Sequence, residues 1–415
     1  MIKYESEVKP DRMSDSSLTF VDLFAGAGGL SLGLEKAGFN HVHAVEVDED
    51  ARLTYANNRD DMDADEITGD IREVDPSDVN DIVGRQRVDL VAGGPPCQGF
   101  SEVVSPDGSD ERNHLFVNFI DWVRELEPEA ALFENVRGMQ KTAGGKFLDA
   151  VKKSFDKLGY KVTHRVVRSS DFGVPQHRRR LVVLATKGGR PDNPLDGFDV
   201  NPVKTPGVMD GIGDLPEVGA GETVEDYDQP PQTVMQKDLR GDCEKLTSHQ
   251  AARHTQDMVE MISHISDGGD RSEIPDELQP SSGYHNSYSR LKSDEPAVAI
   301  TSNMSKPSSA RCIHPFQHRG LTPREGARLQ TFPDSYRFEG GLVSRRQQIG
   351  NAVPPYLGEA LGYYLKRSVF GLESTEKDEE RMSILRGSAL PLEEYAQRRE
   401  ELTEPSQQAT LDIAE

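Results

Sequence analysis

LTFVDLFAGAGGLSLGLEKA, residues 18–37, holds the strongest structural signal in the chain. Thr19–Phe24 is predicted to form an apolar strand, and Leu30–Ala37 a helix with apolar residues at helical spacing. The glycines between them let the backbone turn tightly and approach a ligand, while the helix N-terminus offers free N–H groups. A strand, a glycine turn and a helix in this order predict the first unit of a parallel α/β sheet.

The same alternation continues outward from this unit. Short apolar strands are separated by amphipathic helical segments, and a last helix, Pro354–Lys366, opens with proline. The pattern predicts an α/β fold, with a doubly wound, mostly parallel sheet covered by helices on both faces. Further strands are expected at 42–47, 88–92, 130–134, 161–167 and 180–186, and further helices at 51–57, 114–126 and 147–158.

Composition divides the chain into four parts. Residues 1–16 are polar and are expected to form a flexible leader. Residues 17–188 together with 344–371 carry the α/β pattern and would form one domain. Residues 189–343, whose first part is rich in Gly, Pro and Asp, predict a second, smaller and irregular domain. Residues 372–415 are charged and poor in aromatics, which predicts an acidic mobile tail.

Length and composition exclude several classes of protein. The chain has 415 residues and is long enough for a sizeable core. No apolar stretch approaches the ~18–20 residues of a membrane span, and the first twenty residues lack the apolar block of a signal peptide. The cysteines Cys97, Cys243 and Cys312 cannot form a disulfide framework. We therefore expect a soluble protein of a reducing compartment, the cytoplasm.

The charge balance is strongly acidic, with 71 Asp and Glu against 48 Lys and Arg and a formal net charge of −23. Arg outnumbers Lys by 31 to 17, and the acids are spread along the whole chain. This halophile-like composition favours a protein that works in high salt, where the Debye length shrinks to ~3 Å at 1 M. An ordinary acidic cytosolic enzyme is the alternative. Net charge alone does not exclude DNA as a partner, because only local charge decides phosphate binding.

The first acids after the glycine turn indicate a nucleoside cofactor. The turn is not the dinucleotide fingerprint, since GxGxxG would need a glycine where Ser31 stands. Glu46 ends the second strand twenty residues after Gly26, where a carboxylate can bind a ribose diol. Asp70 is placed to end a third strand and to accept a hydrogen bond from an adenine amino group. This cofactor would need no pyrophosphate cradle.

The block GGPPCQGFS, residues 93–101, directly follows the apolar strand Val88–Ala92. Its prolines stiffen the backbone and its glycines expose it, so Cys97 is expected at the C-terminal end of a strand, where α/β sheets place ligands. We interpret Cys97 as a nucleophile. Cys243 and Cys312 lack such a context and are expected to be small core residues.

Charged residues follow two more predicted strands. Glu134 ends the strand Ala130–Phe133 and brings a carboxylate to the same edge of the sheet. In QHRRR, residues 176–180, alternate side chains of an extended segment face one side, so Gln176, Arg178 and Arg180 are expected to point together. A surface acid and a phosphate-binding patch are the simpler alternatives for these two features.

Taken together, these motifs resemble those of the DNA (cytosine-5)-methyltransferases of bacterial and archaeal restriction–modification systems. The resemblance covers roughly residues 18–370 and implies a Rossmann-like class I methyltransferase fold, with 17–188 plus 344–371 as the catalytic domain and 189–343 as the target-recognition domain. The blocks stand in the family's order: Asp22–Gly29, Gly93–Ser101, Glu134–Val136, Gln176–Arg180, LTPREGARLQTFP at Leu321–Pro333, and QIGNAVPP at Gln348–Pro355.

The resemblance implies S-adenosylmethionine as the methyl donor and assigns roles to residues. Cys97 would add to C6 of a cytosine, Glu134 would hold N3 and the exocyclic amine, and Arg178 and Arg180 would support the site and bind the base carbonyl. No metal site is expected. The cofactor would be bound by Phe24, Ala25, Gly26, Gly29, Leu30, Glu46, Asp70, Ile71, Pro95, Asn351 and Val353.

The implied partner is double-stranded DNA, with the target cytosine flipped out of the helix because Cys97 cannot reach a stacked base. The polar stretch 102–114 would close over that base as a lid. We expect one target sequence, a monomer, association with the nucleoid, and a cognate restriction endonuclease, if present, on a separate chain. Candidate DNA contacts are Gln98, Ser101, Arg112, Gln176, His254, Arg271, Arg290, Arg311, His318, Arg319, Arg324 and Arg328.

Three alternatives remain at this point. The RNA branch of the same family methylates a transfer-RNA cytosine, but its Cys-Phe-Thr signature is absent here. A catalytically silent DNA-binding relative is disfavoured by the intact set of Cys97, Glu134 and Arg178. A nicotinamide oxidoreductase is disfavoured by Ser31, which breaks the glycine fingerprint.

Overall fold

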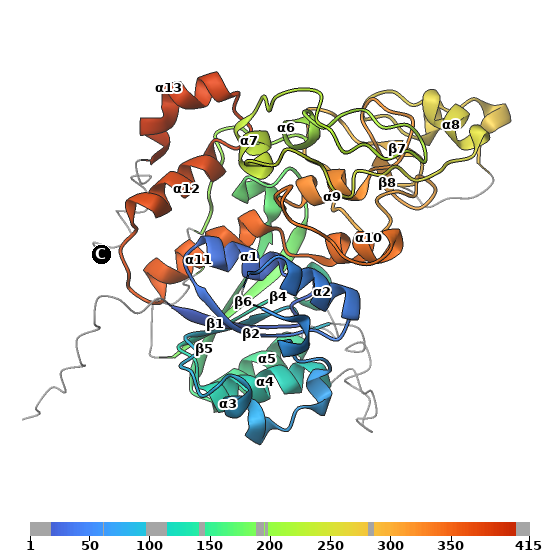
Figure 1. Ribbon diagram of the computed structural model, residues 1–415. Coiled ribbons are helices and arrows are strands. Elements are labelled where there is room, and N and C mark those ends of the chain that lie inside the picture. The colour runs from blue at the N-terminus through green and yellow to red at the C-terminus, as the bar shows by residue number, and fades with distance from the viewer. Residues whose placement is uncertain are drawn as a thin grey trace, which may run out of the picture.

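The computed structural model describes residues 18–60, 62–96, 114–140, 146–187, 195, 198–280 and 286–403. Its centre is a six-stranded sheet of order β2-β1-β3-β4-β6-β5 (Figure 1). The first four of these strands are parallel, whereas β6 runs antiparallel to both β4 and β5. The predicted mostly parallel α/β sheet is confirmed. The strands are β1 Thr19–Leu23, β2 Asn40–Val45, β3 Leu90–Gly93, β4 Ala130–Val136, β5 Tyr160–Arg168 and β6 Arg179–Lys187, with β7 Ser289–Arg290 and β8 Arg311–Ile313 in a separate pair.

Helices cover both faces of the sheet, and further helices follow it in the chain. Those of the first part are α1 Gly29–Lys36, α2 Glu49–Asn57, α3 Val79–Ile82, α4 His114–Leu126 and α5 Lys146–Lys157. The later ones are α6 Val208–Ile212, α7 Val234–Arg240, α8 Gln256–Ser263, α9 Pro323–Leu329, α10 Leu342–Asn351, α11 Pro355–Ser368, α12 Glu376–Arg386 and α13 Leu392–Thr403. None of the helices in the described ranges is long and apolar enough to cross a lipid bilayer.

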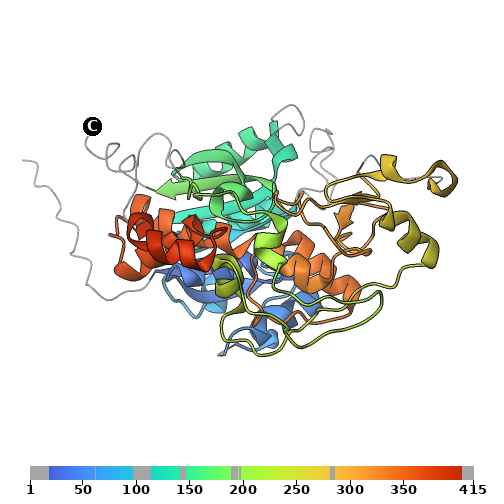
Figure 2. The ribbon, with the colours of Figure 1, turned by 90° about the horizontal axis from the view of Figure 1, so that it is seen from above.

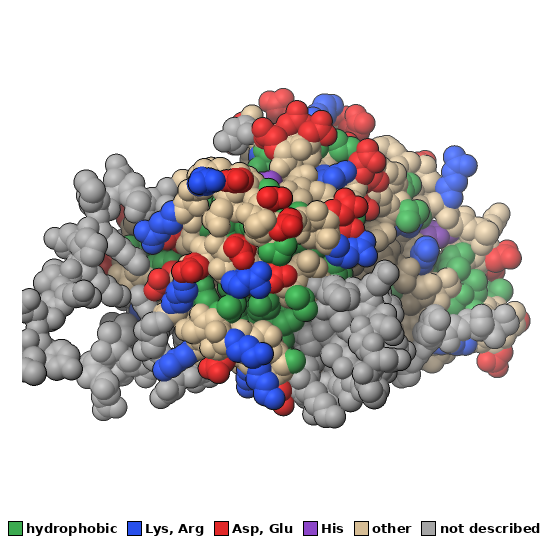
Figure 3. Space-filling model, turned by 90° about the horizontal axis from the view of Figure 1, so that it is seen from below, with side chains coloured by type: hydrophobic (Ala, Val, Ile, Leu, Met, Phe, Trp, Pro, Cys, Tyr) green, Lys and Arg blue, Asp and Glu red, His purple; other side chains and the backbone are tan. Residues whose placement is uncertain are grey.

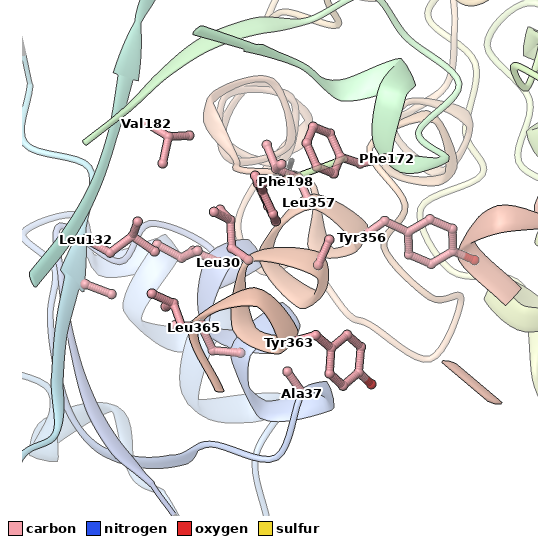
Figure 4. Close-up of a cluster of buried hydrophobic side chains, with 14 of the residues drawn as sticks. Leu30, Ala37, Leu132, Phe172, Val182, Phe198, Tyr356, Leu357, Tyr363 and Leu365 are labelled. Atoms are coloured by element: carbon pink, nitrogen blue, oxygen red, sulfur yellow. The ribbon is translucent and has the colours of Figure 1, made fainter. Parts of the chain in front are cut away.

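On one face of the sheet, α1 and α11 pack together over the strands (Figure 4). Their axes approach closely at Gly33, which has no side chain. A Cβ at this position would lie only 2.4 Å from the backbone nitrogen of Glu359. Leu30 and Leu357 fill the space between these helices and Leu132 of β4. The close contact returns the C-terminal part of the chain to the first glycine turn.

The other face is covered by α4 and α5. Side chains alternate along each strand, so Val91 and Phe133 point to this face while their neighbours point to α1 and α11. Trp122 and Phe119 of α4 are fully buried here. Two independently packed faces leave the C-terminal edge of the parallel strands as the place for a ligand site.

The irregular part is described over residues 198–280 and 286–343, and within these ranges the short pair β7–β8 is the only sheet. The β7–β8 pair and α8 lie at the end of the molecule opposite α12 and α13 (Figures 1 and 2). A small separate core of Ile262, Ile265, Ile274, Tyr288 and Ile313 holds that end together.

The prediction of a mobile tail is wrong for Glu376–Thr403. Helix α12 buries Leu385 completely, and Arg381 forms ion pairs with Asp238 near the end of α7 and Glu359 of α11. The backbone around Ser388 also hydrogen-bonds to α7. Charged residues in this segment are therefore partners of specific buried groups. Residues 1–17, including the predicted leader, and 404–415 lie outside the described part of the chain.

Candidate active site

A cavity of about 660 Å³ opens at the C-terminal ends of the first four strands. Its volume is in the range typical of small-molecule sites. The structure brings all the residues predicted to bind a cofactor to its walls: Phe24, Ala25, Gly26, Gly29, Leu30, Glu46, Asp70, Ile71, Pro95, Asn351 and Val353. Glu134, Arg178 and Arg180 line the same cavity.

The glycine turn forms one end of the cavity. Phe24 and Gly26 adopt positive φ angles of 61° and 55°, and a Cβ on Gly26 would meet no atom within 4 Å, so this turn faces open space. The Glu46 carboxylate accepts hydrogen bonds from the Gly26 and Asp48 backbone N–H groups at 2.7 and 2.9 Å. Burial raises the pKa of Glu46, with these two N–H groups opposing the shift. The carboxylate is thus fixed at the cavity wall as a hydrogen-bond acceptor.

Asp70 does not end a regular strand as predicted. Thr68 makes only an isolated bridge to Val45, and Asp70 caps the 3₁₀ turn Ile71–Glu73. The Asp70 carboxylate pairs with Arg72, whose guanidinium holds the pKa of this acid below its usual range. Asp70 nevertheless lines the cavity, so the correction concerns its local structure.

The C-terminal block completes this end of the cavity. A Cβ on Gly29 would lie 2.2 Å from the Val353 carbonyl oxygen, and one on Gly350 would lie 2.3 Å from the Ser302 nitrogen. Only glycine permits these approaches, which place Asn351 and Val353 beside the first turn.

The other end of the cavity carries Glu134 and two arginines. Arg180 Nε lies 2.7 Å from Glu134 Oε1. Burial raises the pKa of Glu134, while Arg180 and Arg178 oppose that shift. Arg178 is 2% exposed and donates through Nη1 to the carbonyls of Ile300 and Gly350, both at 3.0 Å. Burial, with Arg180 adding to it, lowers the pKa of Arg178 to about 9.

Asn135 holds the loop that leads to the predicted nucleophile. Its Nδ2 donates to the Pro95 carbonyl at 2.6 Å, and both groups are buried. Pro95 and Pro96 line the cavity. Cys97 itself, with Gln98, Ser101, Arg112 and most of the predicted lid, lies outside the described residues. The other two cysteines do not line the cavity. Cys312 is buried as expected, and Cys243 is half-buried.

Four candidate DNA contacts are wrong, because their side chains are buried and committed to protein groups. Gln176 donates to the Leu329 carbonyl at 2.8 Å and does not share the cavity with Arg178 and Arg180. Arg290 hydrogen-bonds to the carbonyls of Ile262, Ile265, His314 and Gln317. Arg319 pairs with Glu325 through both Nη atoms, and Arg324 binds the carbonyls of Thr247, Pro333 and Tyr336.

The prediction that Arg328 contacts DNA is wrong for the same reason, since its side chain is buried between Asp214 and Asp334. Irregular backbone leaves many carbonyls without ladder partners, and guanidinium groups satisfy several of them at once. Arg311, Arg271, His254 and His318 keep partly exposed side chains and remain candidates for DNA contact.

Sequence reasoning missed Asp22 on the cavity wall. This residue of β1 is 1% exposed, and its carboxyl accepts a hydrogen bond from Ser31 Oγ, which in turn contacts the Tyr55 hydroxyl at 2.7 Å. Burial raises the pKa of Asp22 to about 7, although the Ser31 hydrogen bond opposes this. The position of Asp22 inside an apolar strand was the available signal.

Asp22→Asn is expected to change how stability depends on pH. The unfolded pKa is near 3.8 and the folded one near 7, so wild type loses stability as pH rises through this window. Relative to the variant, this loss is expected to total about 4 kcal/mol across the window. Urea unfolding of both proteins between pH 4 and 8 measures it. A pH-independent difference between them would contradict the assigned burial of a neutral acid.

Further residues line the cavity although no binding role was predicted for them; several stand inside the quoted motifs or predicted elements, which do not by themselves assign a contact to each residue. They are Val45, Val47, Asp48, Ala51, Gly69, Arg72, Pro96, Leu115, Asn135, Val136, Ser344, Gln347, Gln348 and Ala352. Among the described residues, no cluster of His, Cys, Asp and Glu is placed to bind a metal ion.

The sequence is similar to known methyltransferases. A family model described as C-5 cytosine-specific DNA methylase matches residues 18–367. Type II methyltransferase M1.HphI of Haemophilus parahaemolyticus is 36% identical over 348 residues, which cover 83% of this chain and 86% of that protein. Type II methyltransferase M.DdeI of Desulfomicrobium norvegicum is 36% identical over 370 residues, covering 83% and 87%.

Solved structures show the same architecture. A prophage-encoded E. coli protein, assigned as a DNA modification methyltransferase, superposes with a TM-score of 0.70 and 26% identity, covering 85% of this chain and 100% of that one. The Dnmt2 methyltransferase of S. pombe superposes with a TM-score of 0.55 at 17% identity over 84% of this chain and 98% of that one, a likeness of fold alone.

Proposed function

The chain belongs to the C-5 cytosine-specific DNA methylase family, and we propose that it performs the family's reaction through a covalent adduct between Cys97 and C6 of the target cytosine. The protein is a DNA (cytosine-5)-methyltransferase that acts on double-stranded DNA and takes its methyl group from S-adenosylmethionine. The predicted fold, reaction class and methyl donor are thereby confirmed. The adduct and the residue roles below are our proposal.

One observation carries the proposal: a single cavity has a cofactor end and a base end. Glu46 and the glycine turn lie at the first, and the Glu134–Arg180 pair lies at the second. Pro95 and Pro96, which immediately precede Cys97 in the chain, line the same cavity. A methyl donor and a cytosine bound in one cavity would have their reacting atoms side by side.

The cofactor end fits S-adenosylmethionine. The fixed Glu46 carboxylate suits a ribose diol, and Asp70 suits an adenine amino group. Phe24 and Ile71 offer apolar surface to the adenine ring. Asn351 and Val353 would close over the amino-acid part. When bound, the cofactor supplies an electrophilic methyl group.

The chain's own residues would prepare C5 to receive that group. The Cys97 thiolate forms a bond to C6, and the displaced electron pair is delocalised over C5 and N3, where Glu134 supplies a proton or hydrogen bond. C5 then accepts the methyl group, loses its own proton to a base, and the Sγ–C6 bond breaks to release Cys97 and 5-methylcytosine. Covalent addition replaces one difficult step, alkylation of an aromatic carbon, with easier ones.

Arg178 would act as a positioning residue in this scheme. Its two Nη atoms are committed to the carbonyls of Ile300, Gly350 and Asn351, so it joins the base end to the C-terminal block. Arg180, paired with Glu134, is the better candidate to approach the base carbonyl.

The target cytosine must leave the duplex to enter the cavity, at a cost of a few kcal/mol. We propose that residues 189–343 recognise the DNA sequence while 17–188 and 344–371 carry the chemistry. Acidic and basic side chains are intermixed on the face shown in Figure 3, so the net charge of −23 does not make the surface uniformly acidic. Monomeric state, nucleoid association and a separately encoded endonuclease belong to the same proposal.

Transfer of tritiated methyl groups tests the substrate class. Incubation with duplex DNA and with bulk transfer RNA is expected to label only the DNA, in a form that resists ribonuclease and is lost with deoxyribonuclease. Label in the RNA alone would favour the RNA branch of the family and contradict the proposal. Cofactor binding without any label would favour the silent relative.

A further inference from the structure

Charges divide unevenly between the two ends of the cavity. At the base end, Arg180 is paired with Glu134. At the cofactor end, Arg72 is paired with Asp70, yet no ion pair among the described residues joins Asp22 or Glu46 to a cation. The cofactor end therefore carries two acidic side chains that form no ion pair with a cation, and such a wall favours a positively charged ligand.

Asp22 is the more enclosed of these two acids. Its hydrogen-bond partner, Ser31 on α1, is neutral, and Ser31 contacts the neutral Tyr55 hydroxyl on α2. The nearby cation Arg59 is bound at 2.7 and 3.1 Å to both carboxylate oxygens of Glu35. Arg59 favours the ionised form of Asp22, whereas Glu35 and Glu46 oppose it.

Burial dominates this balance and raises the pKa of Asp22 to about 7. The carboxyl is therefore close to its titration point near neutral pH in the protein without ligand. A unit positive charge brought next to a buried carboxyl shifts such an equilibrium strongly, because Coulomb interactions are poorly screened at a group that water does not reach.

We propose that Asp22 releases its proton to solvent when a sulfonium-bearing ligand enters the cavity and keeps it when the ligand is the neutral thioether. This inference rests on the cavity being the S-adenosylmethionine site. Methyl transfer converts the sulfonium cation into the neutral thioether of S-adenosylhomocysteine, so Asp22 takes a proton back from solvent after the reaction. Asp22 thus helps the protein bind the donor more tightly than the spent product.

Isothermal titration at pH 7 in two buffers of different ionisation enthalpy counts the protons released. Wild type is expected to release about half a proton more than Asp22→Asn when S-adenosylmethionine binds, since a group of pKa near 7 is half protonated there. With S-adenosylhomocysteine the two proteins are expected to release equal numbers. Asp22→Asn is also expected to reduce the affinity ratio of donor to product roughly tenfold.

Equal proton release by wild type and Asp22→Asn with S-adenosylmethionine would overturn the inference, as would an excess that appears with both ligands. Absence of binding heat with either ligand would instead count against the cavity as the cofactor site, so the two failures are distinguishable.

If Asp22→Asn does not fold, Ser31→Ala provides the test. It keeps the carboxyl but removes a hydrogen bond that favours the ionised form, so proton release is expected to peak at a higher pH than in wild type. An unchanged pH profile would overturn the inference.

Discussion

Cys97→Ala is expected to lower the rate of methyl transfer to DNA by about four orders of magnitude or more, since removal of a covalent nucleophile leaves only binding and orientation. Affinity for S-adenosylmethionine is expected to change little, because the cofactor end is built from Glu46, the glycine turn and the C-terminal block. Single-turnover rates and equilibrium dialysis measure the two quantities.

Cys243→Ala is the matched control. Cys243 is half-buried and does not line the cavity, so this variant is expected to keep the wild-type rate. A duplex with 5-fluorocytosine at the target adds a direct readout: fluorine at C5 cannot leave as a proton, so the adduct is trapped. Wild type and Cys243→Ala are expected to form a complex that survives denaturation, and Cys97→Ala is not. A trapped complex with Cys97→Ala would contradict the role of Cys97.

Glu134→Gln is expected to reduce the rate by about 10²–10⁴-fold, the usual contribution of a positioned acid or base. The amide keeps the size of the side chain and can donate a hydrogen bond, but it has no acidic proton to transfer to N3 and leaves Arg180 without its anionic partner. Because burial raises the pKa of Glu134, the protonated form persists to higher pH than for an ordinary Glu. The wild-type rate is therefore expected to fall on the alkaline side as Glu134 ionises, and this limb is expected to vanish in the variant.

Glu129→Gln, the same substitution at the opposite end of β4, provides the control and is expected to leave both the rate and its pH profile unchanged. Rates of tritium transfer between pH 5 and 9 compare the three proteins. If Glu134→Gln keeps more than about a tenth of the wild-type rate, Glu134 is not the proton donor at N3.

The elements that form the site followed directly from the sequence, because strand periodicity and glycine turns are local signals. Thr19–Phe24 and Ala130–Glu134 were placed within two residues of β1 and β4, and the acids Glu46 and Glu134 reached the cavity as expected. Asp22 was missed because its place inside an apolar strand marks it as unusual but does not say that its side chain reaches the cavity. Its burial depends on Ser31 and Tyr55, which come from two other elements.

Buried arginines were beyond the reach of sequence. Arg290 and Arg324 were interpreted as surface charges, yet they satisfy backbone carbonyls that the irregular region leaves without strand partners. The prediction of a mobile tail was wrong for a related reason. Arg381 and Leu385 pack against α7 and α11, which are distant in the sequence, so no local pattern shows that these residues have partners. Function in high salt stays a prediction from composition.

The most direct test is base-resolution sequencing of 5-methylcytosine in DNA from an expression host that carries either wild type or Cys97→Ala. We expect methylation of cytosine within one short sequence in the wild-type host and none at that sequence with the variant. Unmethylated DNA in the wild-type host, with the protein folded and binding S-adenosylmethionine, would show that DNA is not the substrate. Methylation that persists with Cys97→Ala would show that Cys97 is not the nucleophile.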